Sequence, residues 1–294
     1  MDIKESALIE SLPLNAGVRV LAFNEDGLVA LYKPEGTMSH PNKTQDIKRS
    51  LITASYDFDK EFFFWKEDDG QERKVWLIHR LDSPTSGIIL IGLNEEISKL
   101  IKAEFSTHKV TKHYHALVRH PLPKNAGIWA DTLRKDLINN GRKILKAHPI
   151  KAKSGFQLVS NPVGGFPISL IKLSPITGRT HQLRIQCSKH GHPIVGDRTY
   201  GSFSFNKEVG QRTGVKRMML HSSEVILKYA FKGKLKSFHV KSDLPEAFNA
   251  VFRYRPGMAK LEEKDRTIEK DPTDTIDSVP AHKALLDGRR FKAV

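Results

Sequence analysis

Residues 79–87 read HRLDSPTSG and lead without interruption into the apolar segment IILI at residues 88–91. The first stretch is polar and ends in TSG, which is typical of a turn. A polar loop that enters a buried strand holds its side chains on a stiff frame, and catalytic residues are often found on such loops. The pattern therefore predicts a turn that presents the carboxylate of Asp82 beside a core strand.

Considered without the rest of the chain, Asp82 is better explained as a structural residue. An aspartate here can accept a hydrogen bond from a backbone N–H two residues further on and so close the turn. A functional interpretation of Asp82 therefore depends on what other segments contribute.

Most of the regular structure that the sequence predicts is extended. Runs of β-branched and aromatic residues bounded by turn residues are typical of strands. Such runs cover Val18–Phe23, Leu28–Tyr32, Ile88–Leu93, Val110–Val118, Ile168–Leu173, Glu224–Tyr229 and Ser237–Val240. Strands and helices do not alternate regularly, which favours an α+β fold with a mixed or antiparallel sheet over a doubly wound nucleotide-binding fold.

Two helices are predicted. Asn94 is the expected N-cap of a helix over residues 95–107, because the apolar side chains that follow fall on one face, namely Ile97, Leu100, Ile101 and Phe105. The second helix covers about Thr180–His190, and Gly191 can supply its left-handed stop.

The charge balance favours a polyanionic partner. Lys and Arg number 48 and Asp and Glu 33, so the formal net charge is +15 at pH 7. Residues 259–294 carry as many acidic as basic side chains, so the excess lies on residues 1–258. We expect an N-terminal extension at residues 1–17, a folded body at residues 18–258 and a polar, flexible tail at residues 259–294.

Several classes of protein are excluded or disfavoured. Cys187 is the only cysteine, so an internal disulfide cannot form. The longest apolar run, Gly87–Leu93, is far shorter than the roughly 20 residues that cross a bilayer. Neither a Walker loop nor a GxGxxG spacing occurs, so no nucleotide cofactor is expected. The acidic start of the chain is unlike a signal peptide, and these features together predict a cytoplasmic protein.

Five further segments join residues 79–87 in a pattern. They are KPEG at residues 33–36 with HP at 40–41, KHYHA at 112–116, TGRTHQLR at 177–184, HPIVGD at 192–197 with YG at 200–201, and LHS at 220–222. In this order and spacing they resemble the RluA-type pseudouridine synthases over roughly residues 18–245.

The resemblance implies a single catalytic domain with a mixed, mainly antiparallel sheet flanked by helices and loops. It also implies an enzyme that isomerises specific uridines in ribosomal or transfer RNA to pseudouridine without a cofactor. Asp82 matches the catalytic aspartate, Tyr114 the tyrosine that packs on the target base and helps to move its proton, and Arg184 the arginine that pairs with the carboxylate.

The remaining matches are expected to bind substrate. Arg80 corresponds to the residue that fills the gap left in the RNA when the uridine is flipped out. The other expected substrate-binding residues are His79, Arg179, His181 and Gln182.

The chemistry suits these residue types. A carboxylate can act as nucleophile on C1′ or as base at C2′, and the sequence does not choose between the two. A guanidinium beside Asp82 would favour the ionised acid, and a planar guanidinium such as that of Arg80 can replace a flipped base in the stack.

Structural interpretations compete with the functional ones. Arg184 can be an ordinary helix residue and Tyr114 a core residue, while Lys33, Pro34 and Asp197 are expected to have structural roles. The aromatic run at residues 62–65 is expected to fill the core as a hairpin rather than to stack on RNA.

No metal site is expected. The two histidine pairs, His113 with His115 and His190 with His192, supply too few clustered ligands for a zinc site. On a strand, the first pair would lie on the face opposite Tyr114.

Two rival functions remain. A non-catalytic RNA-binding protein could keep the same fold, although the intact Asp82, Tyr114 and Arg184 argue against it. A glycoside hydrolase built around Asp82 would need a second carboxylate about 5 to 10 Å away, and the motif supplies one obvious acid.

Gln186 and His120 depart from the family pattern, and the stretch from Asp57 to Lys74 is longer and more aromatic than is usual there. The position in the RNA that is modified is therefore not predicted.

Overall fold

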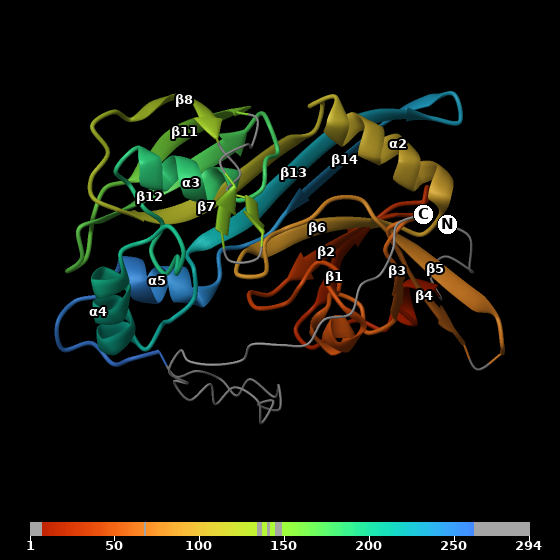
Figure 1. Cartoon of the computed structure of the whole chain (residues 1–294), viewed down its shortest axis with the longest axis horizontal. Coiled ribbons are helices and arrows are strands. Elements are labelled where there is room, and N and C mark those ends of the chain that lie inside the picture. The colour runs from red at the N-terminus through yellow and green to blue at the C-terminus, as the bar shows by residue number, and fades with distance from the viewer. Residues whose placement is uncertain (1–7, 68, 134–136, 140–141, 145–148, 262–294) are drawn as a thin grey trace. The chain divides into compact units, whose positions relative to one another are not determined.

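In a computed structural model of the chain, one sheet forms the frame of the protein (Figure 1). The structure describes residues 8–67, 69–133, 137–139, 142–144 and 149–261. Within these residues the sheet has 12 strands, namely β1 (Arg19–Phe23), β2 (Leu28–Lys33), β3 (Ser55–Asp57), β4 (Phe62–Lys66), β5 (Glu72–Leu77), β6 (Ser86–Gly92), β7 (Thr111–Arg119), β8 (Ala126–Leu133), β11 (Ile150–Ser160), β12 (Ile168–Pro175), β13 (Leu220–Phe231) and β14 (Lys234–Lys241). A separate two-stranded pair consists of β9 (Leu137–Asn139) and β10 (Arg142–Ile144).

The helical segments are few and short. They are the 3₁₀ helix η1 (Thr44–Arg49) and the α-helices α2 (Glu95–Ser106), α3 (Gln182–Lys189), α4 (Phe203–Thr213) and α5 (Glu246–Phe252). The main path of the sheet runs β3-β4-β5-β6-β13-β7-β12-β11-β8, with β2 also on β6, β1 on β2 and β14 on β13. All of these pairings are antiparallel except that of β13 with β6. The expected α+β fold with a mixed, mainly antiparallel sheet is confirmed.

Strand β6 is the element on which the polar stretch at residues 79–87 ends. All seven of its residues are buried, because the sheet is covered on both faces here. Alternate side chains of a strand point to opposite faces, so Ile88 and Leu90 join one core cluster while Ile89 and Ile91 join another. This double burial explains why a continuous apolar run follows the turn.

The parallel contact between β6 and β13 brings two backbones very close together. Gly87 has φ +112°, and a Cβ at this position would lie 2.1 Å from the carbonyl oxygen of Ser222. Only glycine fits such an approach. The end of the polar turn is thereby held against β13.

Helix α2 forms as the sequence predicts. The side chain of Asn94 accepts a hydrogen bond from the N–H of Ile97 at the N-cap. Ile97 and Ile101 are buried in the cluster that also contains Leu90, and Leu100 and Phe105 pack against its edge.

Helix α3 begins two residues later than expected and ends as predicted. Its C-cap is His190, and Gly191 follows with φ +83°. Leu183 and Cys187 anchor the helix in a third core cluster that includes residues of β7 and β12. The buried side of α3 therefore fixes the direction of Arg184, which lies one residue after Leu183.

The seven predicted strands are all present, and the aromatic run at residues 62–65 lies in a hairpin of β4 and β5, as expected. Phe62 and Phe63 are buried, which confirms core filling for these two residues, whereas Phe64 and Trp65 are half-buried. The strands β3, β8 and β11 and the helices α4 and α5 were not predicted, because their polar and apolar residues do not give a clean period.

In the part of the chain that the structure describes, no helix is both long and apolar enough to cross a membrane. The compact unit that contains the sheet ends at Leu261. Residues 262–294, which make up most of the expected tail, lie outside the described residues, and the division of the chain at residues 17 and 258 stays a prediction.

Candidate active site

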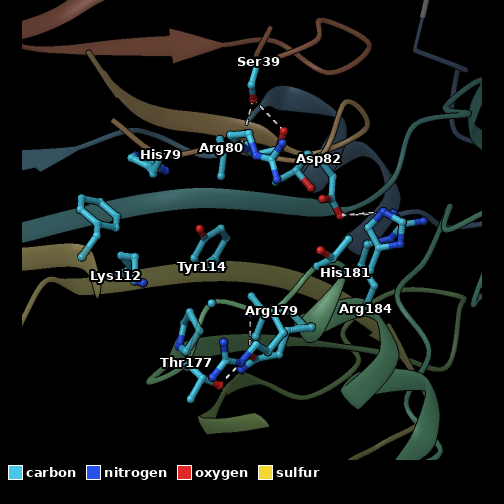
Figure 2. A pocket seen from close by; sticks show the side chains of 18 of the residues that line it. Ser39, His79, Arg80, Asp82, Lys112, Tyr114, Thr177, Arg179, His181 and Arg184 are labelled. Atoms are coloured by element: carbon cyan, nitrogen blue, oxygen red, sulfur yellow. Dashed lines mark hydrogen bonds and ion pairs between the residues drawn. The ribbon is translucent and has the colours of Figure 1, made fainter. Parts of the chain in front are cut away.

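A cavity of about 820 Å³ opens where the turn before β6, strand β7 and the start of α3 meet. Its wall includes Arg80, Asp82, Tyr114, His181 and Arg184, which come from segments far apart in the chain. Figure 2 shows Asp82 facing Arg184 and His181, with Arg80 beside Asp82 and Tyr114 across the cavity. The fold thus gathers the three residues expected to be catalytic.

The carboxylate of Asp82 is held by a guanidinium. Nη1 of Arg184 donates a hydrogen bond to Oδ2 of Asp82 at 3.2 Å. The side chain of Arg184 is 6% exposed and that of Asp82 26%, so the charge pair lies at the wall of the cavity rather than in open solvent. An ion pair in such a site is screened less by salt than one on the surface.

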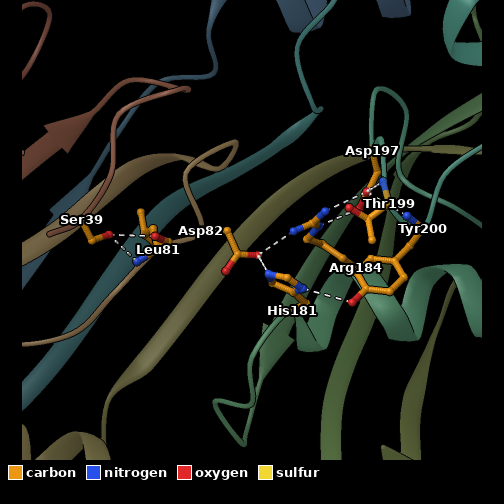
Figure 3. Close-up of polar contacts among 8 residues, drawn as sticks. All are labelled: Ser39, Leu81, Asp82, His181, Arg184, Asp197, Thr199 and Tyr200. Atoms are coloured by element: carbon orange, nitrogen blue, oxygen red, sulfur yellow. Dashed lines mark hydrogen bonds and ion pairs between the residues drawn. The ribbon is translucent and has the colours of Figure 1, made fainter. Parts of the chain in front are cut away.

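Arg184 is held in turn by Asp197, whose side chain is 1% exposed. Nε of Arg184 donates to Oδ2 of Asp197 at 2.7 Å, and Nη2 donates to Oδ1 at 2.8 Å (Figure 3). This two-bond fork fixes the guanidinium plane. The predicted structural role of Asp197 fits these contacts.

The electrostatics of this buried pair favour charge on both partners. Burial works against the charged guanidinium, but the hydrogen bonds and charge of Asp197 raise the pKa of Arg184. Burial also opposes the charged form of Asp197, yet Arg184 and the backbone N–H groups of Tyr200 and Thr199 lower its pKa. One fork therefore stays charged and serves two carboxylates.

His181 approaches the same oxygen of Asp82. Its Nε2 lies 3.9 Å from Oδ2, and its Nδ1 lies 3.1 Å from the hydroxyl of Tyr200. Oδ1 of Asp82 has no hydrogen-bond partner among the described residues. The arrangement leaves one carboxylate oxygen to face the cavity contents.

Lys33 holds the turn that carries Asp82 through hydrogen bonds to backbone carbonyls. Its Nζ, which is completely buried, donates to the carbonyls of Pro34, Thr37 and Ser83 at 3.0, 2.7 and 3.0 Å. The structural role expected of Lys33 is confirmed, because its hydrogen bonds are to backbone oxygens and join the segment after β2 to Ser83, the residue that follows Asp82.

A second set of bonds joins the same two segments. The N–H of Gly36 donates to the carbonyl of Ser83 at 2.9 Å, and the hydroxyl of Ser83 donates to the carbonyl of Gly36 at 2.9 Å. The hydroxyl of Ser39 donates to the carbonyl of Leu81 and accepts from its N–H. Sequence reasoning missed Ser39, because a bond to a distant backbone leaves no local pattern.

Tyr114 projects from β7 into the cavity (Figure 2). Its ring packs against two of the core clusters, and burial raises the pKa of its phenol to about 12. The phenol is therefore neutral at ordinary pH and offers a ring face and an O–H group.

His79 lines the cavity but also holds the turn in place. Its ring stacks on Phe105 with centroids 4.6 Å apart, and its Nε2 accepts the N–H of Leu90 at 3.1 Å. Burial, helped by the charge of Lys112, lowers the pKa of His79 to about 3. His79 is therefore a neutral residue that supports Arg80.

Gln182 and Arg179 differ in how freely their side chains can contact a substrate. The amide oxygen of Gln182 accepts from the hydroxyl of Thr177 and the N–H of Arg179, and its amide nitrogen donates to Ser154 and to the carbonyl of Lys153. Both ends of this amide are thus used to order the loop before α3. The side chain of Arg179 is exposed at the cavity.

The first histidine pair, His113 with His115, is engaged elsewhere. Nδ1 of His113 lies 2.8 Å from the hydroxyl of Ser174, and Nδ1 of His115 lies 2.8 Å from that of Ser223. Neither histidine lines the cavity that Tyr114 lines. Within the described residues no cluster of three or more histidine, cysteine or carboxylate side chains could hold a metal.

Comparison with known proteins gives one consistent result. The model of the RNA pseudouridylate synthase family matches residues 27–189. A tRNA pseudouridine synthase C from Yersinia pestis is 28% identical over 76% of this chain and 87% of its own length. A dual-specificity RNA pseudouridine synthase RluA from Vibrio vulnificus is 28% identical over 87% of this chain and 96% of its own. The chain spans 59% of the length of a third relative, tRNA pseudouridine synthase C from Pectobacterium carotovorum subsp. carotovorum, at 29% identity.

Solved structures show the same fold. Human RNA pseudouridylate synthase domain containing 1 has a TM-score of 0.56 at 23% identity, over 80% of this chain and 87% of its own. Human RNA pseudouridylate synthase domain containing 4 has a TM-score of 0.56 at 20% identity, over 85% and 98%.

The low pKa of His79 predicts a pH dependence of stability. The unfolded chain protonates this imidazole below about 6.5, whereas the folded chain does not until about 3. The unfolded state thus binds more protons over this interval, so His79 makes the free energy of unfolding fall as the pH falls, by up to about 1.4 kcal/mol per pH unit. Urea unfolding at pH 7 and pH 5 should show a smaller loss for His79→Gln, which keeps an acceptor for Leu90, than for the wild type. Equal losses would contradict the assignment.

Proposed function

This chain belongs to the RNA pseudouridylate synthase family, whose members are isomerases, and we propose that it converts specific uridines of ribosomal or transfer RNA into pseudouridine at Asp82. The observation that carries the proposal is the single carboxylate held at a cavity wall by a buried guanidinium. The formal charge of +15 suits a polyanionic substrate. The names of the relatives refer to tRNA and, in one case, to a dual-specificity RNA pseudouridine synthase, which supports tRNA as one class of substrate.

Basic side chains at the cavity suit an RNA backbone. Arg80, Lys102, Lys112 and Arg179 all line it. Phosphate contacts position an RNA and supply most of its affinity, whereas contacts to the base select the nucleotide. A uridine within a helix or folded loop hides C1′, so the nucleotide must swing out of its stack to reach Asp82.

The reaction needs no redox step and no external energy. The N1–C1′ bond breaks with its electron pair going to uracil N1, the freed uracil turns, and C5 forms the new bond to C1′. The proton on C5 is then removed and uracil N1 takes up a proton, so the product has the same atoms as the substrate. A single carboxylate is enough for this sequence, as nucleophile on C1′ or as base at C2′.

Oδ1 is the oxygen of Asp82 that reacts. Arg184 and His181 both approach Oδ2, so the carboxylate is oriented while Oδ1 is left without a hydrogen-bond partner among the described residues. In the nucleophilic route Oδ1 bonds to C1′, and in the alternative route it takes the C2′ proton. Positioned charge of this kind lowers the barrier, because the site does not reorganise during the step.

Tyr114 supplies a stacking face for the uracil and a relay for the C5 proton. Burial holds its pKa at about 12, so the phenol enters the reaction protonated. It can accept the C5 proton only while passing its own proton on. The ring itself provides an apolar surface for the base.

Arg80 takes the place of the flipped nucleotide. Its side chain is exposed and lies two residues before Asp82, on the same turn. A planar guanidinium can stack and donate several hydrogen bonds to bases left unpaired. The wedge and the carboxylate are therefore separated only by Leu81, whose backbone is held by the hydroxyl of Ser39.

Replacement of Asp82 tests the catalytic proposal. Wild type and Asp82→Asn are each incubated with unmodified total RNA, and pseudouridine is mapped by chemical probing. We expect new pseudouridines at discrete sites with the wild type and a rate loss on the order of a thousandfold with the variant, because the amide is neither nucleophile nor base. Asparagine has the same shape and still accepts a bond from Arg184. Identical maps would instead support an RNA-binding protein without activity.

Replacement of Arg80 tests the wedge. Arg80→Ala should slow a single turnover more than it weakens RNA binding, because phosphate contacts supply most of the affinity. Arg179→Ala is the matched control, since it also removes an exposed arginine from the cavity. That control should weaken binding and leave the rate at saturating protein nearly unchanged. Equal losses of binding and rate in Arg80→Ala would count against the wedge.

A further inference from the structure

Arg80 is exposed, yet its guanidinium has a specific partner. Nη1 of Arg80 lies 3.0 Å from Nε2 of His40, a residue that also lines the cavity. A guanidinium can only donate, so the imidazole nitrogen must accept this bond. His40 must therefore carry no proton on Nε2 for the contact to exist.

A second contact gives His40 the tautomer that the first one needs. Nδ1 of His40 lies 2.9 Å from the carbonyl oxygen of Pro41. A carbonyl can only accept, so Nδ1 carries the proton, and Nε2 is left with a lone pair for Arg80. The two bonds are mutually consistent only for the neutral ring with its proton on Nδ1.

The ring of His40 is also fixed in orientation. It stacks on Tyr56, with ring centroids 5.3 Å apart and planes at 13°. Tyr56 is buried and packs on Phe63 of the hairpin core, with centroids 4.7 Å apart. Through Tyr56 of β3, the ring of His40 is thus packed on the aromatic core of β4, with its acceptor nitrogen toward Arg80.

Ser39, the residue before His40, anchors this segment to the turn. The hydroxyl of Ser39 bonds to both backbone groups of Leu81. Consecutive residues 39 and 40 therefore contact consecutive residues 81 and 80. The segment with Ser39 and His40 therefore holds both the backbone of Leu81 and the guanidinium of Arg80.

We propose that His40 is a positioning residue that holds Arg80 extended beside Asp82, ready to enter an RNA stack; this inference rests on the proposed function. An arginine side chain loses considerable rotamer freedom when it is ordered. With His40 in place, much of that freedom is lost before the RNA binds, so less of it must be lost during base flipping. The bond to His40 then exchanges for bonds to the RNA.

Two variants separate the acceptor from the ring. His40→Phe keeps a ring to stack on Tyr56 but has no acceptor, whereas His40→Gln loses the ring but can place an amide oxygen near the position of Nε2. We expect His40→Phe to slow a single turnover about tenfold, the equivalent of one hydrogen bond to a charged group, with RNA affinity within about twofold because phosphate contacts dominate it. We expect His40→Gln to recover most of the rate. A normal rate in His40→Phe together with a slow His40→Gln would show that only packing matters and would overturn the proposal.

A double variant and a spectroscopic measurement complete the test. Once Arg80 is alanine, His40→Phe should have no further effect, because the two residues act as one unit; additive losses would overturn the proposal. In the RNA-free protein, imidazole nitrogen shifts should report the Nδ1–H tautomer of His40, and the Nε2–H tautomer would overturn it independently of activity. If Arg80→Ala alone leaves the rate unchanged, the proposed wedge fails; if Arg80→Ala is slow and His40→Phe is not, only the present inference fails.

Discussion

The fork of Arg184 joins two carboxylates, and the rest of the site follows from this contact. Asp197 takes two of its bonds and is almost fully buried, which compensates the charge that helix α3 carries inward. The remaining Nη1 reaches Asp82 across the cavity wall. A lone buried guanidinium would be costly, so Asp197 is what allows a charged donor to stand beside Asp82. The proposed chemistry depends on the orientation that this donor imposes.

Both partners of the pair are held by larger packing. Helix α3 is anchored by Leu183 and Cys187 in the cluster shared with β7 and β12. The turn with Asp82 ends on the doubly buried strand β6 and is held by Lys33 and Ser39 through backbone bonds. Side chains set between two such supports have little freedom, which is what a preorganised site requires. Stability and proposed function therefore draw on the same contacts.

The sequence predicts well what local patterns determine. The continuous apolar run at residues 88–91 predicts a buried strand, and Asn94 predicts the start of a helix. The structure confirms both. Strand β11 was missed because exposed lysines and Gly155 interrupt its apolar residues. Asp82, Tyr114 and Arg184 do meet at one cavity, but their roles remain predictions that came from a motif pattern. The partners Ser39 and His40 act through tertiary contacts that no single segment encodes, and Gln182, expected to bind substrate, has both ends of its amide engaged by the protein.

The most direct measurement of the central claim is a crystal structure of the protein with an RNA whose target uridine carries fluorine at C5. Fluorine replaces the proton that must leave, so the nucleotide should remain in the site. We predict that the nucleotide is flipped into the cavity with C1′ next to Oδ1 of Asp82, while Nη1 of Arg184 stays on Oδ2. A flipped nucleotide whose sugar lies away from Asp82, or an Arg184 that leaves Asp82 to bind the RNA, would contradict the account.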